Sequence, residues 1–228
     1  MLLFSYLLLL VVLIRINSMN VIKRYSENFY ILGSGSFSRK LILKSNNINF
    51  EVLKADIDEY SIGDRSIGTD EKTSELVLLL ANSKADAIIK NGIPDKLYGQ
   101  LLLTCDQVVT HQNKILEKPK DINEARKFIQ SYSNSFCSTI GSLILTDTIS
   151  NKRRHCIDKA TIYFNTIPND IIEKILDEKI CLQCAGGLMV EHPLIQPYIK
   201  CIDGTQEALM GLSTISLKLL TKQFIDDI

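Results

Sequence analysis

The spacing of apolar residues divides the chain into segments that predict strands and segments that predict helices. Runs with apolar residues on both faces, or alternating with polar ones, predict strands, whereas an apolar residue at every third or fourth position predicts a helix. We expect strands near residues 29–32, 50–53, 101–109, 140–146 and 158–165. We expect helices near residues 37–44, 74–90, 121–132, 168–178 and 214–224. This succession of strands and helices predicts an α/β fold.

Two parts of this pattern are especially informative. Apolar residues fill both faces of the segment 101–109, as a strand buried in a sheet requires, so it is the most core-like strand. The strands near 140–146 and 158–165 are predicted to form a hairpin through the basic loop 151–155. The stretch 60–73 is polar and contains glycine, which predicts a loop.

The N-terminus begins with an almost unbroken apolar run at residues 2–14. The run is too short to span a bilayer unaided, and no basic region precedes it as in a signal peptide. Three interpretations stay open: a targeting or anchor segment, an upstream extension of the gene model before Met19, and a helix packed on the domain. We assign residues 1–18 to an apolar N-terminal extension, either signal- or anchor-like or an extension of the gene model, and residues 27–226 to one domain. We expect the protein in the cytoplasm, with contact to a membrane only if residues 2–14 are a real anchor.

Composition narrows the class of ligand. The 228 residues are 46% hydrophobic and 23% charged, which fits one domain or at most two small lobes. The 26 basic and 26 acidic residues cancel, and no basic cluster is interleaved with aromatics, so we expect no nucleic-acid partner. The six cysteines lie mostly in apolar contexts and are predicted to be reduced. A small anionic ligand is compatible with this neutral chain.

The segment FYILGSGSFSRK at residues 29–40 predicts a phosphate site. A strand that ends in Gly33-Ser-Gly-Ser36 leaves backbone N–H groups free at the N-terminus of the next helix, where phosphate oxygens are good acceptors. Arg39 and Lys40 add two cations in the first helical turn, where they are unfavourable unless an anion is present. The segment matches neither the dinucleotide fingerprint nor the P-loop pattern.

Carboxylates and lysines elsewhere add candidate chemistry. Asp106 lies inside the most core-like strand, where a carboxylate is costly unless it is paired, bound to metal or at the mouth of a site. Residues 55–59 place three carboxylates after the second predicted strand. Alternation along that strand predicts that Asp58 faces away from Glu59. Lys84 lies on a predicted helix, and Pro119 fixes Lys118.

Taken together, these segments resemble the Maf family of nucleoside triphosphate pyrophosphatases, which is related in fold to the inosine triphosphate pyrophosphatases. The resemblance runs from about residue 29 to residue 220 through colinear blocks. The blocks are LGSGSFSRK at 32–40, ADIDE at 55–59, SKADAI at 83–88, TCDQVV at 104–109, EKP at 117–119, CAGGL at 184–188, EHP at 191–193 and MGLS at 210–213.

The resemblance implies a mixed central sheet flanked by helices, with two lobes around a nucleotide cleft. It also implies hydrolysis of a nucleoside triphosphate between the α- and β-phosphates, a homodimer, and Mg²⁺ or Mn²⁺ as the cofactor. The residues it implies for catalysis are Asp106, Lys84, Lys118 and Glu59, of which Asp106 and Glu59 would also hold the metal. The residues it implies for substrate binding are Ser34, Ser36, Arg39, Lys40, Gln107 and Glu191.

Two details resemble the branch of the family that contains plant proteins and bacterial enzymes favouring 7-methyl-GTP. These details are Gln107 after the aspartate, and Cys184-Ala-Gly with Glu191 in place of the glutamine common elsewhere in the family. The other branch favours dTTP and UTP. A carboxylate at Glu191 would accept hydrogen bonds from a guanine edge. Lys40 departs from the usual arginine and lacks its bidentate fork. A nucleotide-binding regulator of cell division and a phosphatase or nucleotidyltransferase remain alternatives.

Overall fold

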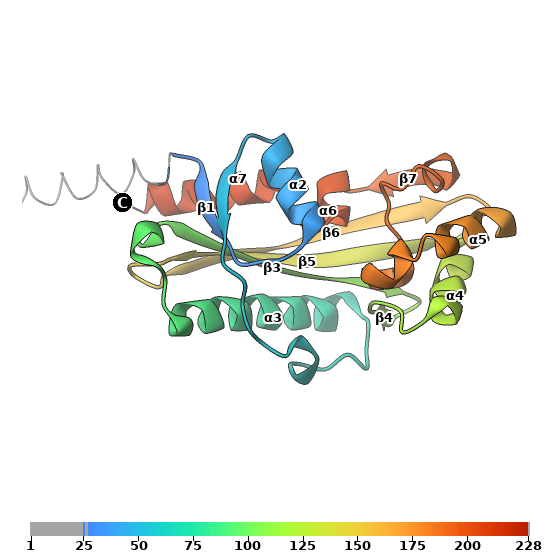
Figure 1. Ribbon diagram of the computed structural model, residues 1–228, viewed down its shortest axis with the longest axis horizontal. Coiled ribbons are helices and arrows are strands. Elements are labelled where there is room, and N and C mark those ends of the chain that lie inside the picture. Colours follow the sequence, from blue (N-terminus) through green and yellow to red (C-terminus); the bar gives the residue numbers. More distant parts are fainter. Residues whose placement is uncertain (1–24, 26, 228) are drawn as a thin grey trace, which may run out of the picture.

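The computed structural model describes residues 25 and 27–227 of the chain. Within that part, a seven-stranded sheet runs along the long axis of the molecule and helices cover both of its faces (Figure 1). The strands are β1 (Phe29–Leu32), β2 (Asn49–Val52), β3 (Leu101–His111), β4 (Lys114–Leu116), β5 (Phe136–Asp147), β6 (Arg153–Phe164) and β7 (Ile199–Asp203). The α-helices are α2 (Phe37–Ser45), α3 (Asp70–Asn91), α4 (Ile122–Tyr132), α5 (Asn169–Asp177), α6 (Gln206–Leu209) and α7 (Thr214–Asp226).

The sheet is mixed, which confirms the expected fold class. Its order is β2-β1-β3-β5-β6-β7, and β4 pairs with the end of β3. Strand β1 is parallel to β2 and β3, whereas β3, β5, β6 and β7 pair antiparallel. Helices α2 and α3 make the crossovers that parallel strands require. The loop 33–36 therefore follows β1 at its C-terminal end, next to the central strand β3.

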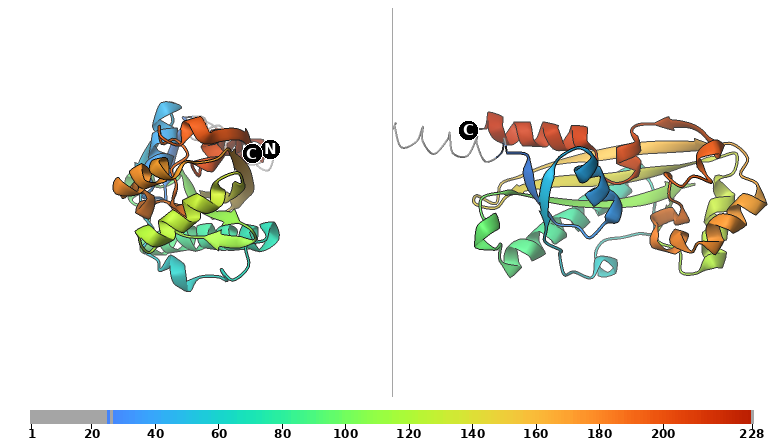
Figure 2. Two further views of the ribbon diagram at one scale, coloured as in Figure 1. Left: turned by 90° about the vertical axis from the view of Figure 1, so that its right-hand side faces the viewer. Right: turned by 45° about the horizontal axis from the view of Figure 1, so that its top comes forward.

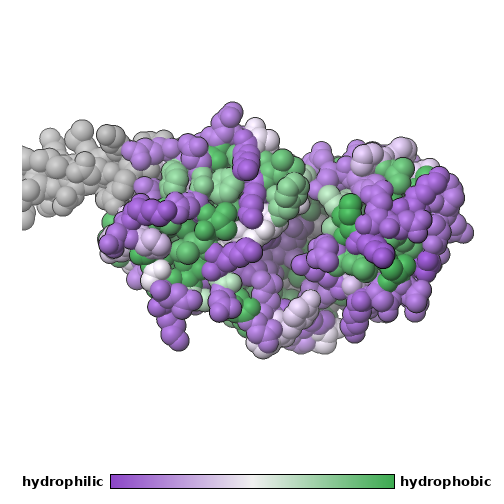
Figure 3. Space-filling model, viewed as in Figure 1, coloured by the Kyte–Doolittle hydropathy of each residue, from purple (hydrophilic) through white to green (hydrophobic). Residues whose placement is uncertain are grey.

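Two lobes share the long strands β3, β5 and β6, which run from one end of the molecule to the other (Figures 1 and 2). The core of the first lobe includes Tyr30, Leu43, Leu103, Leu217 and Phe224, packed under α2 and α7. The core of the second lobe includes Ile129, Tyr132, Ile162, Ile172 and Leu176, packed under α4 and α5. In Figure 3 the surface is hollowed between the two lobes, with hydrophobic areas on either side.

The segments expected from the sequence are found, with shifted ends. Strands β5 and β6 are longer than predicted. Residues 153–155 of the predicted basic loop belong to β6, and the loop lies at residues 148–152. Helix α3 starts at Asp70, four residues earlier than the expected start at Ser74. The sequence analysis does not predict strands β4 and β7: β4 has only three residues, and β7 is mostly exposed and carries little apolar pattern.

The apolar run at residues 2–14 and the assigned extension 1–18 lie outside the described residues. Among the residues that the structure describes, no helix combines the length and the apolar character needed to cross a bilayer. The six cysteines are all free thiols, as expected, and burial raises the pKa of Cys137 to about 12.

Candidate functional site

The loop between β1 and α2 holds the predicted phosphate site. Gly33 donates its N–H to the carbonyl of Leu103 on β3 at 2.8 Å. A Cβ at this position would lie 2.6 Å from the Thr104 side chain, so only glycine lets the loop approach β3 this closely. Ser36 is the N-cap of α2 and accepts a hydrogen bond from the N–H of Arg39 at 3.4 Å. The helix N-terminus thus opens directly beside the central strand.

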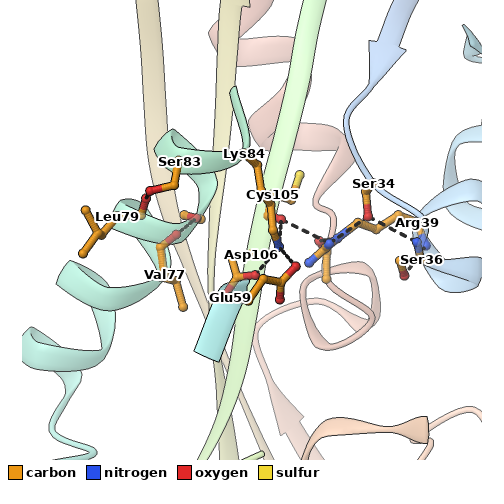
Figure 4. Close-up of polar contacts among 12 residues, drawn as sticks. Ser34, Ser36, Arg39, Glu59, Val77, Leu79, Ser83, Lys84, Cys105 and Asp106 are labelled. Carbon is orange, nitrogen blue, oxygen red and sulfur yellow. Dashed lines mark hydrogen bonds and ion pairs between the residues drawn. The ribbon is translucent and has the colours of Figure 1, made fainter. Parts of the chain in front are cut away.

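Arg39 points back under this loop rather than out to solvent (Figure 4). Its guanidinium donates to Ser34 Oγ at 3.1 Å, to the Cys105 carbonyl at 3.2 Å and to the Gly211 carbonyl at 2.9 Å. All three acceptors are neutral, so the buried positive charge has no counter-ion among these contacts. The arginine expected to need an anion therefore already has oxygen partners, and it keeps its charge next to the loop.

Lys84 on α3 lies between two carboxylates (Figure 4). Its Nζ is 2.5 Å from Asp106 Oδ1 and 2.9 Å from Glu59 Oε1. It also donates to the Cys105 carbonyl at 3.4 Å, the same oxygen that Arg39 contacts. The structure therefore brings the first crossover, helix α3 and the central strand together at one point.

Burial sets the proton affinity of Asp106. Asp106 is only 6% exposed. This burial raises the pKa of its carboxyl, whereas the charges of Lys84 and Arg39 oppose the rise. The net shift is upward because removing a carboxylate from water outweighs those partners. Glu59 also raises the pKa, since a second negative charge lies on the other side of Lys84. A carboxylate with a raised pKa is a stronger base.

Two adjacent cavities open beside this cluster. The first, here called the charged cavity, is lined by Glu59, Tyr60, Arg65, Leu80, Asp106, Gln107, Val108, Glu117, Lys118 and Ala185. Lys118 is exposed on its wall. Lys118 therefore faces the same space as Asp106, although it forms no hydrogen bond or ion pair with the residues that the structure describes.

The second is here called the apolar cavity for the hydrophobic side chains on its walls, although polar side chains line it too. Its walls come from the start of α2, from β3, β5 and β6, from α4 and α6, and from the segment 183–191. Its lining residues are Ser36, Ser38, Gln107, Val109, Tyr132, Cys137, Thr139, Ile162, Gln183, Cys184, Ala185, Gly186, Leu188, Met189, Val190, Glu191, Leu209 and Met210. Gln107 and Ala185 belong to both cavities and mark the boundary between them. Gln107 is held there by a 2.7 Å hydrogen bond from its Nε2 to the Leu209 carbonyl.

Glycines shape the walls of the apolar cavity. Gly186 has φ +69°, and a Cβ there would lie 2.8 Å from Tyr132 Oη and 2.9 Å from the Val109 side chain. Its carbonyl accepts a 2.8 Å hydrogen bond from that tyrosine. Gly211 has φ +96° and would place a Cβ 2.3 Å from Gln107 Oε1. The CAGGL and MGLS blocks thus give close packing around Gln107 and the cavity wall.

Some predictions about the site need correction. Strand β2 ends at Val52, so residues 55–59 do not continue it and strand alternation does not place Asp58. Asp58 instead caps a short 3₁₀ turn, η1 (Glu59–Ser61), by accepting from the Tyr60 N–H. The predicted substrate contact of Lys40 stays a prediction: the residue is half-buried on α2 and lines neither cavity, and its ammonium has no hydrogen bond or ion pair in the described part of the chain.

Arg65 and Glu117 also line the charged cavity, and sequence reasoning did not single out either of them. They form a 2.8 Å ion pair across 52 positions of sequence. No local pattern marks such a pair, because its partners meet only in the folded chain.

Asp106 and Glu59, which share Lys84, each keep a second carboxylate oxygen that could contact a metal ion. Lys84 engages one oxygen of each, and no other hydrogen bond engages Asp106 Oδ2 or Glu59 Oε2 within the described residues. No group of three or more His, Cys, Asp or Glu side chains there could hold a metal by itself. This donor set suits a hard cation that takes its remaining ligands from phosphate and water.

Comparison with known proteins gives one family. A family model described as "Maf-like protein" matches residues 30–224. A 7-methyl-GTP pyrophosphatase of Dictyostelium discoideum is 32% identical over 201 residues, covering 87% of this chain and 96% of that protein. A dTTP/UTP pyrophosphatase of Acholeplasma laidlawii is 29% identical over 196 residues, covering 86% and 95%. A solved nucleoside-triphosphatase, or dITP/XTP pyrophosphatase, from Mycobacterium abscessus is 9% identical; the match covers 86% of this chain and 93% of that chain. Its TM-score of 0.38 is too low to bear on the fold.

Proposed function

Because the chain belongs to the Maf-like protein family, we propose that it is a nucleoside triphosphate pyrophosphatase that releases a nucleoside monophosphate and pyrophosphate. One observation supports this most directly. The ion cluster of Lys84, Asp106 and Glu59 faces a charged cavity that adjoins an apolar cavity at Gln107. A nucleotide that spans both would place its base in the apolar cavity and its phosphates at the boundary near Gln107, between Ser36 on the wall of the apolar cavity and Asp106 and Lys118 on the wall of the charged one.

The phosphates would meet donors from three elements. Ser34 and Ser36 already accept hydrogen bonds, so each hydroxyl proton is free to donate to a phosphate oxygen. Arg39, beside Ser34, and Lys118, on the wall of the charged cavity, would add positive charge. Lys40 lines neither cavity and would have to reach the phosphates from α2. Charge on the leaving pyrophosphate grows during the reaction, and preorganised cations stabilise it.

Asp106 is the residue we propose to activate the attacking water. Its raised pKa makes it a stronger base than an ordinary aspartate, and Lys84 holds its carboxylate in place. Asp106 and Glu59 would also hold Mg²⁺ or Mn²⁺ through their second oxygens. A bound ion of this kind neutralises phosphate charge and orients the substrate.

The base is proposed to be a guanine type, such as that of 7-methyl-GTP. Glu191 lines the apolar cavity, and a carboxylate there would accept from the N1–H and the exocyclic amine of guanine. Thymine and uracil have only one N–H on that edge. The named relatives include both 7-methyl-GTP and dTTP/UTP enzymes, so a dTTP/UTP pyrophosphatase is the alternative. A homodimer in the cytoplasm and the absence of a nucleic-acid partner are also part of this proposal.

A nucleotide panel with Mg²⁺ and product analysis tests the proposal. We expect pyrophosphate and monophosphate, with faster turnover of 7-methyl-GTP or a related purine than of UTP or dTTP. Inorganic phosphate as the product would instead indicate a phosphatase. Tight binding without turnover would indicate a regulator.

Asp106→Asn tests the role given to Asp106. This variant should lower kcat by about 10² or more, as loss of a catalytic base does. Equal activity in the variant would remove Asp106 from the mechanism.

A further inference from the structure

We propose that Arg65 is a positioning residue that sets Glu59 against Lys84, in an inference that rests on the proposed function. The segment between β2 and α3 carries Glu59, and its described secondary structure is one 3₁₀ turn of three residues. Local hydrogen bonds from the Tyr60 N–H and the Ser61 hydroxyl to Asp58 shape this turn, but they do not fix its place against α3 and β3. The side chain of Glu59 is 49% exposed, so burial does not fix it either. Contacts from elsewhere must therefore place this carboxylate.

Arg65 supplies those contacts. Its Nη2 donates to the Glu59 carbonyl at 2.6 Å and its Nη1 to the Ile62 carbonyl at 2.6 Å. The guanidinium also lies 5.7 Å from the centre of the Tyr60 ring. One side chain therefore ties together both ends of the turn η1, and a planar guanidinium holds such a geometry better than an ammonium would.

The other side of the guanidinium anchors this turn to the rest of the protein. Its Nε donates to Glu117 Oε1 at 2.8 Å, in the segment that continues from β4 to Lys118. A second contact lies nearby, where the Gly68 N–H donates to the Asn113 carbonyl at 2.9 Å. The Arg65 side chain is 19% exposed, so this ion pair is better shielded than most surface pairs. Arg65 thus joins the segment of Glu59 to the segment of Lys118 across the charged cavity.

Another Arg–Glu pair gives a matched control. Arg126 on α4 makes two 2.8 Å hydrogen bonds to Glu173 on α5, and neither residue lines a cavity. Both pairs link elements that are distant in sequence through the same chemistry. An effect on activity that comes from losing any arginine–glutamate pair would appear in variants of both arginines. An effect that comes from a misplaced Glu59 would appear only in the Arg65 variant.

The experiment compares Arg65→Gln with Arg126→Gln in the full chain. We expect Arg65→Gln to lower kcat for pyrophosphate release by about tenfold with little change in KM, because a misplaced group costs rate more than binding. Arg126→Gln should leave kcat unchanged. The double variant Glu59→Gln/Arg65→Gln should be no slower than Glu59→Gln alone, since Arg65 acts through Glu59. Additive losses, or an unchanged kcat in Arg65→Gln, would overturn the proposal.

Hydrogen exchange gives a readout that does not depend on turnover. Amides of residues 59–66 should exchange about threefold faster or more in Arg65→Gln, and remain as in the parent in Arg126→Gln. Unchanged exchange in Arg65→Gln would show that the turn holds itself and would refute the inference. If the parent chain releases no pyrophosphate from any nucleotide, the proposed function fails, and the exchange comparison alone decides whether Arg65 places this segment.

Discussion

The two cavities of this protein are built on different physical principles. In the charged cavity, ionic groups hold one another: Lys84 binds Asp106 and Glu59, and Arg65 binds Glu117. In the apolar cavity, close packing of strand side chains and glycines forms the wall, and Glu191 is the one carboxylate among its lining residues. Both cavities share Gln107.

This difference separates rate from specificity. A change in the charged cavity alters buried charges that affect one another over several ångströms, so we expect large effects on turnover for any nucleotide. A change in the apolar cavity alters packing or one hydrogen-bonding edge, so we expect smaller effects that depend on the base. Variants in each cavity test this separation.

The largest effect is expected for Lys84→Met in the charged cavity. The variant removes the ammonium that lowers the pKa of Asp106 against the effect of burial, so the pKa of that carboxyl should rise further. Because the proposed role of Asp106 as base needs its deprotonated form, the acidic limb of the pH–rate profile should move to higher pH. We also expect kcat to fall by about 10², as for loss of a preorganised charge.

A pH–rate profile of Lys84→Met beside Lys90→Met measures this. Lys90 is exposed near the end of the same helix, so its loss should leave the profile unchanged. A profile of Lys84→Met with its acidic limb unmoved would show that Asp106 is not the titrating base.

The sign of the linkage gives a related expectation for stability. Asp106 has a higher pKa in the folded state than the ordinary value, so the folded protein binds more protons at this group than the unfolded chain does. Its contribution to stability is therefore present at acidic pH and is lost as pH rises through the raised pKa. The deprotonated form of Asp106, which the proposed mechanism uses, is thus the form that destabilises the fold.

The next effect is expected for Gly186→Ala in the wall of the apolar cavity. The new Cβ would meet Tyr132 and Val109 at under 3 Å with φ at +69°, so we expect a loss of about 2 kcal/mol in the free energy of unfolding. Gly92→Ala is the control, because φ is +91° there but nothing lies within 4 Å of the new Cβ. It should cost about 1 kcal/mol through backbone strain alone. Equal losses in urea denaturation would show that packing at Gly186 is not tight.

How much the sequence predicts also differs between residues of the site. Asp106 was found because a carboxylate breaks the apolar pattern of its strand, and the loop at 33–36 because glycines and serines follow a strand. Arg65 was missed because its partner Glu117 is 52 positions away and nothing local marks the contact. Glu59 was found by its block, but the strand alternation used to orient it was wrong because the strand ends earlier. Local patterns thus predict which groups are present, and tertiary contacts decide how they are held.

The smallest effect is expected for Glu191→Gln, and it should fall on base choice rather than rate. Gln offers one acceptor and one donor where the carboxylate offers only acceptors, so one hydrogen bond to a guanine edge is lost. We expect the ratio of kcat/KM for 7-methyl-GTP over dTTP to fall about tenfold, the size of one hydrogen bond to a charged group. Glu178→Gln is the control, because Glu178 contacts His192 at 3.0 Å and lines neither cavity. An unchanged ratio in Glu191→Gln, with intact turnover, would show that Glu191 does not determine which base is preferred. Base choice would then depend on the packing of the cavity walls.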